Sequence, residues 1–111
     1  MTNLAGRAAG LLAGSGDVFL AGEHVAPVRY RVRQDQGVLS AETFGGTIQV
    51  PGFMSRTGTV VVLGSGVRLG ETDEPFTLRM ADGRELDFFA TLVHGSRNTY
   101  DLLGAGDIRT P

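Results

Sequence analysis

Glycine is the residue that most constrains this chain, because seventeen glycines are spread singly and in pairs along its 111 residues. Average usage in globular proteins is only about 7%. Glycine supplies the positive φ angles that tight turns need, and it weakens the interior of a helix. The spacing therefore predicts a fold of many short strands joined by tight turns.

The segment VRYRVRQD, residues 28–35, alternates apolar and charged residues with the period of a half-buried β-strand. One set of side chains is predicted to face the core, and the other set is predicted to face outward. The core set is Val28, Tyr30 and Val32, and the outward set, the arginine row, is Arg29, Arg31 and Arg33.

From Asp17 onward the whole chain has the pattern of strands and turns, and its clearest hairpin has Asp82–Gly83 at the tip. We expect an all-β fold, a small antiparallel barrel or sandwich of about six to eight short strands. Residues 3–13 are the single helix candidate. The sequence therefore predicts a helical or flexible segment over 1–16 and one barrel-like domain over 17–111.

A weak internal repeat is visible when the sequence is shifted by 60 residues, which places 18–51 over 78–111 without a gap. It would make each half a three-stranded meander, with residues 52–75 as the connection and the two apolar faces packed on each other. Amphipathic strands share much of this pattern through their period alone. A true duplication and a chance agreement both remain open.

Charge and composition exclude several classes of function. The formal net charge is −2, so no overall positive field attracts nucleic acid, and a nucleic-acid partner is not favoured. The absence of cysteine excludes disulfides, thiolate metal sites and cysteine nucleophiles. No apolar run is long enough for a membrane-spanning helix, and the N-terminal segment lacks the charged start of a secretory signal. We expect a cytoplasmic protein.

The string VVVLGSGVRLG, residues 60–70, has glycines spaced like a degenerate dinucleotide-binding fingerprint. That fingerprint needs a helix directly after the glycines, but ETDEPF follows here and leaves no room for one. The string is better interpreted as a turn between strands, and no cofactor is predicted. The acidic segment Glu71–Glu74 lacks the spacing of a calcium loop and is expected to be a solvated loop.

Three interpretations of the arginine row are open. It can be a solvated strand face paired with carboxylates, for which Glu42, Glu85 and Asp87 are the candidate partners. It can bind an anionic small molecule or protein, or it can bind nucleic acid. The paired face is favoured, because Tyr30 is the one aromatic residue of the strand and points to the opposite side. A concave setting without a carboxylate in reach would favour an anion site.

A polar site at one rim of the barrel is the second candidate. The strand pattern places His94 inward with Phe88 and Leu92, and Arg97 and Tyr100 could add polar contacts for a small ligand. Ser96 and Asp101 imitate a Ser–His–Asp set, but no nucleophile-elbow signature is present. We therefore expect His94 to form a hydrogen bond with the backbone. The spacing of the two histidines predicts no metal site.

The segment PGFMSRTG, residues 51–58, is predicted to be a flexible connector that carries Phe53 and Met54. These residues would either fill the core or contact a partner, since loops rarely expose such side chains. Phe89 and Val93 add a second apolar strand face, which must meet another part of the chain or another subunit. A homo-oligomer or a protein partner is therefore expected.

Three functional hypotheses follow. The first is a non-catalytic binding or assembly module, because catalytic signatures are absent and apolar strand surface is in excess. The second is a barrel enzyme or small-ligand carrier with a rim site around His94. The third is anion or nucleic-acid binding by the arginine row.

Overall fold

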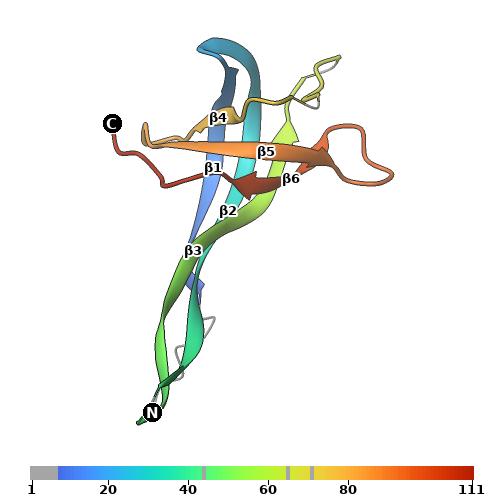
Figure 1. The fold of residues 1–111 in the computed structure, drawn as a ribbon. Helices are drawn as coiled ribbons and strands as arrows, with labels where there is room; N and C mark the ends of the chain where they lie inside the picture. The colour runs from blue at the N-terminus through green and yellow to red at the C-terminus, as the bar shows by residue number, and fades with distance from the viewer. Residues whose placement is uncertain (1–7, 44, 65, 71) are drawn as a thin grey trace.

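The computed structural model describes residues 8–43, 45–64, 66–70 and 72–111, and they form an antiparallel β-barrel (Figure 1). Six strands close the barrel in the spatial order β1-β2-β3-β6-β5-β4. The strands are β1 (Ala8–Leu20), β2 (Glu23–Thr43), β3 (Gly46–Val62), β4 (Phe76–Arg79), β5 (Glu85–Leu92) and β6 (Thr99–Gly104). The predicted all-β barrel is confirmed.

The chain forms two consecutive three-stranded meanders, β1–β3 and β4–β6. Their edges meet twice, where β3 pairs with β6 and where β1 pairs with β4. The β1–β4 seam is short and consists of Asp17–Phe19 against Thr77–Arg79. The connection between the meanders is residues 63–75, because β3 continues to Val62, and the predicted connection over 52–75 is too long. Whether the two meanders arose by duplication stays a prediction.

The predicted helix over residues 3–13 is not confirmed. From Ala8 onward this segment is strand β1, and Leu11 pairs with Arg33 of β2. Its glycines destabilise a helix, and pairing with β2 supplies backbone hydrogen bonds to the segment instead. The predicted boundary at residue 16 falls inside this strand, and residues 3–7 lie outside the described residues.

Apolar side chains fill the inside of the barrel. The alternation of residues 28–35 predicted part of this core correctly, because Val28, Tyr30 and Val32 are buried. Bulky side chains from both meanders meet there, including those of Leu78, Phe88 and Tyr100. Among the side chains that the structure describes, the buried hydrophobic residues are Val18, Ala26, Val28, Tyr30, Val32, Val60, Val62, Leu69, Phe76, Leu78, Met80, Leu86, Phe88, Tyr100 and Leu102.

Two buried tyrosines tie loops to the barrel through their hydroxyl oxygens. The Tyr100 oxygen accepts a hydrogen bond of 3.0 Å from the backbone N–H of Leu69, in the connection between the meanders. The Tyr30 oxygen accepts one of 3.1 Å from the N–H of Ala81, in the β4–β5 turn. Each phenol therefore buries its ring in the core and satisfies a backbone donor at the core boundary.

Strands β2 and β3 are much longer than the barrel requires. Beyond Asp35 and Ser55 they pair only with each other within the described residues, and a register shift between Gln36 and Val38 marks the start of this extension. We name residues 36–54 the arm. Figure 1 shows it projecting from the barrel. The radius of gyration is 16.6 Å, against about 13 Å for a compact chain of this length.

The arm overturns the predicted connector over residues 51–58, because these residues belong to β3. Pro51 is tolerated there since it pairs with Val38 next to the register shift, in a ribbon whose outer edges pair with no other described strand. Phe53 and Met54 are strand residues, and their side chains lie outside the described part of the structure.

Gly58 of β3 lies directly against β2, and a Cβ atom there would overlap the backbone carbonyl oxygen of Arg31. We predict that Gly58→Ala lowers the free energy of unfolding by about 1–3 kcal/mol, the usual cost of overpacking. Urea denaturation provides the measurement. Gly70→Ala is the matched control, since Gly70 has open space around its Cα, and equal stability of the two variants would contradict the prediction.

Replacing Tyr100 with Phe removes the acceptor for the N–H of Leu69, a buried residue. We expect Tyr100→Phe to destabilise the fold by about 1–3 kcal/mol, because a buried donor is left unsatisfied. Tyr30→Phe is the comparison, and it should cost less because Ala81 is exposed and its amide can turn to water. Thermal unfolding of both variants tests this order, and the reverse order would contradict it.

Candidate functional site

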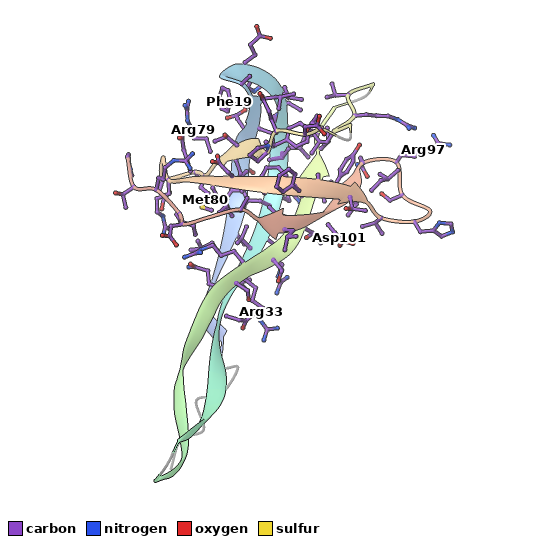
Figure 2. All side chains as sticks on the ribbon, in the orientation of Figure 1. Phe19, Arg33, Arg79, Met80, Arg97 and Asp101 are labelled. Carbon is purple, nitrogen blue, oxygen red and sulfur yellow. The ribbon has the colours of Figure 1, made fainter. Side chains whose placement is uncertain are left out.

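The arginine row lies on the outer face of the barrel, as the alternation predicted. Arg29, Arg31 and Arg33 are all exposed, while the residues between them are buried. Figure 2 shows Arg33 beside the point where the arm leaves the barrel. Each arginine has a neighbour on both sides, because β2 pairs with β1 and with β3 along this stretch.

The surface around the row is concave. Two adjoining hollows of about 480 and 380 Å³ share Arg31 and Thr59, and together they contain all three arginines. The cross-strand neighbours are short or apolar, so the long arginines stand between low flanks. We name this surface the arginine trough. Its flanks are Gly10, Leu11, Ala13 and Ser15 from β1, and Thr57, Thr59 and Val61 from β3.

The carboxylates expected to pair with the arginine row are engaged elsewhere or lie outside the described side chains. Arg33 has a partner within its own strand, since its Nε lies 3.2 Å from the carboxylate of Asp35. Arg29 and Arg31 make no ion pair with any residue that the structure describes. Two of the predicted partners are therefore wrong: Glu85 and Asp87 bind other arginines. The side chain of Glu42, in the arm, is not described.

Glu85 and Asp87 belong to an ion-pair network over β4, β5 and the C-terminal segment. Arg79 Nη2 lies 3.0 Å from Glu85, and Arg109 Nη2 lies 3.0 Å from Asp87. Backbone hydrogen bonds in both directions join Glu85 and Arg109, and they hold the C-terminal segment against β5. Hydrogen bonds from Arg109, and then from Thr77, lower the pKa of Asp87 below its ordinary 3.8.

The structure does not assemble the predicted rim site. His94 is exposed, contrary to the inward orientation predicted from the strand period. Strand β5 ends at Leu92 and the chain turns at Gly95, whose φ is 82°, so the alternation does not extend to His94. Tyr100 is a core residue whose hydroxyl is bonded to Leu69, and it does not line a rim.

Ser96 and Asp101 form no catalytic set with His94 among the described residues. The hydroxyl of Ser96 accepts hydrogen bonds from the N–H groups of Asn98 and Thr99, at 3.2 and 2.9 Å, and so it stabilises its own turn. Asp101 is exposed on β6, where it pairs with Thr59 across the sheet. These residues therefore act in turn and strand structure.

Arg97 lines a different concavity, of about 720 Å³, between the loop that follows β3 and the loop that follows β5. Arg68 lies in the same hollow, and no carboxylate is present among its described lining residues. Figure 2 shows Arg97 far from the arm. Sequence analysis did not select Arg68, because only the barrel closure brings these two loops together.

In the described ranges, no group of three or more His, Cys, Asp or Glu side chains is placed to hold a metal ion. No helix in those ranges is long and apolar enough to cross a membrane. Comparison with known protein families, with curated proteins and with solved structures finds no match to this chain.

The ion pair between Arg109 and Asp87 predicts a specific pH dependence. The pKa of Asp87 is lowered in the folded state, so the pair stabilises the fold above the unfolded-state pKa and loses that effect as the pH falls through the folded-state value. Arg109→Gln should raise the pKa of Asp87 towards 3.8 and destabilise the fold at neutral pH more than in acid. NMR titration of the carboxyl groups measures the pKa of Asp87. Urea unfolding at neutral and at acid pH measures the change in stability.

Arg84→Gln is the control for this experiment, because Arg84 pairs with Asp82 in the β4–β5 turn and not with Asp87. It should leave the Asp87 titration unchanged. An Asp87 pKa that is the same in the Arg109→Gln variant and the parent protein would refute the assigned cause.

Proposed function

We propose that this protein is a non-catalytic assembly module, which associates with copies of itself through the arm and the outer face of the barrel. The observation that carries the proposal is the arm. It is a two-stranded ribbon that extends beyond every other described strand of the barrel. A hairpin of this kind is at best marginally stable in water without further packing.

The composition of the arm supports a buried role. Glu42 is the single charged residue in residues 36–54. The register pairs Leu39 with Val50 and Ala41 with Ile48, and residues paired two positions apart share one face of a ribbon. Exposed strand edges with few charges tend to pair with other chains, and natural proteins normally protect them. A partner that covers the arm would give the ribbon the packing that it lacks and would protect its edges from other chains.

Exposed apolar side chains also lie on the outer face of the barrel, on strands next to β2 and β3. Leu103 is 58% exposed and pairs with Thr57 of β3, and Phe89 is 40% exposed and pairs with Leu103. Leu11, 53% exposed, lies on the other side of the arginine row. Exposed apolar residues that line up across neighbouring strands are typical of interaction surfaces.

The other hypotheses receive less support from the geometry. A small-ligand site around His94 needs that residue, Arg97 and Tyr100 to converge, but Tyr100 faces the core while the other two are exposed. The arginine row is a surface feature that is compatible with assembly.

The proposal is tested by measuring the mass in solution with size-exclusion chromatography and light scattering. The protomer mass is 11.7 kDa, and we expect the full chain to form oligomers at micromolar concentration. Replacing residues 36–54 with a two-residue Asn-Gly turn should give a monomer whose barrel remains folded, as checked by circular dichroism. A full chain that stays monomeric would contradict the proposal.

A second variant tests the apolar residues of the arm while the length of the arm stays the same. Ile48→Ser with Val50→Ser keeps the length of the arm and should weaken association, since each lost apolar contact contributes about 1–3 kcal/mol when buried. Thr47→Ser with Gln49→Ser is the matched control, because these residues take the alternate positions of the same strand. Equal association of the two double variants would refute a role for the apolar pairs.

A further inference from the structure

We propose that the arginine trough binds an acidic segment of a second copy of this chain, the segment around Asp73 and Glu74. The inference rests on the proposed assembly function and identifies the surfaces that would meet. It follows from the lack of an ion pair at Arg29 and Arg31 among the described residues, the shape of the trough and the carboxylates left unpaired elsewhere in the described part of the chain.

The spacing of the arginines is set by strand β2. Arg29, Arg31 and Arg33 occupy alternate positions of β2, so their Cα atoms are about 7 Å apart along the strand. The row projects from a strand that is paired on both sides, which fixes its spacing before any partner arrives.

Two of the three positive charges of the row are available. Arg29 and Arg31 are exposed and form no ion pair within the described part of the chain, and the hollows beside them leave room for incoming side chains. Asp101, on the same outer face, is separated from Arg31 by Thr59. A guanidinium group forms two parallel hydrogen bonds with a carboxylate, which makes an acidic side chain the fitting ligand.

The chain itself supplies such carboxylates in the connection between β3 and β4. Asp73 and Glu74 are exposed and have no ion pair among the described residues. Asp73 and Glu74 are consecutive residues, so the segment places two carboxylates close together as ligands for Arg29 and Arg31. Most other described carboxylates are already paired, namely those of Asp17, Asp35, Asp82, Glu85, Asp87 and Asp107.

A protein segment fits the trough better than a nucleic acid does. The trough contains Leu11, which is more than half exposed, and the aromatic ring of Tyr30 is buried beneath it. Nucleic-acid sites usually combine cations with exposed aromatic rings for base stacking, and the chain has a formal net charge of −2. Mixed apolar and cationic lining is typical of a protein interface.

Charge reversal tests the contact in the full-length chain. Arg29→Glu with Arg31→Glu, and separately Asp73→Arg with Glu74→Arg, should each weaken self-association about tenfold or more, since two exposed ion pairs are lost and like charges then face each other. Mixing the two double variants should restore association in a one-to-one ratio. Arg68→Glu with Arg97→Glu is the matched control, because these arginines are exposed, carry the same charges and line a different hollow.

The outcomes separate this inference from the proposed function. If the parent chain assembles and both trough variants assemble equally well, the trough contact is wrong while the assembly function stands. Loss of association in both double variants without recovery on mixing would also overturn the pairing.

A second measurement applies even if the parent chain is monomeric. A synthetic peptide of residues 68–78, titrated into the ¹⁵N-labelled chain, should shift the amide signals around Arg29 and Arg31, and the shifts should weaken with salt. A peptide with Asn and Gln in place of the acidic residues should not. Absence of shifts with the acidic peptide would refute the inference, as would tighter binding of a single-stranded DNA oligonucleotide to the same residues.

Discussion

The backbone ladder of strand β2 is the interaction on which the rest of the structure depends. Over residues 28–35 this strand is paired with β1 on one side and with β3 on the other. It continues beyond β1 into the arm, so the same strand builds the barrel wall and the extension. Because successive residues of a strand face opposite sides, this ladder also decides which side chains are buried and which are presented outward.

One alternating pattern thereby produces both the core and the candidate binding surface. The valines of the pattern and Tyr30 close the inside of the barrel, and the hydroxyl of Tyr30 also fixes the β4–β5 turn. The arginines have no such role in the fold, and two of them lack an ion pair among the described residues. The core therefore does not depend on these arginines, which leaves them free to serve an intermolecular contact.

The sequence predicted those features that depend on local pattern. The strand class, the buried face of residues 28–35 and the hairpin at Asp82–Gly83 follow from period and turn chemistry, and Gly83 has the positive φ that this turn needs. Features that depend on distant pairing were missed. Pro51 was interpreted as part of a connector, because only the register against Val38 shows how a strand accommodates it. The engagement of Asp87 by Arg109 likewise depends on barrel closure.

The long register between β2 and β3 has a mechanical consequence. The two strands pair from the barrel wall to the end of the arm, with one register shift. A neighbour that pulls along the arm would load these hydrogen bonds in shear, so that many of them carry the force together. A sideways load would instead bend the ribbon at its base, where β1 ends and two strands continue alone. The arm is therefore stiff against tension and compliant against bending.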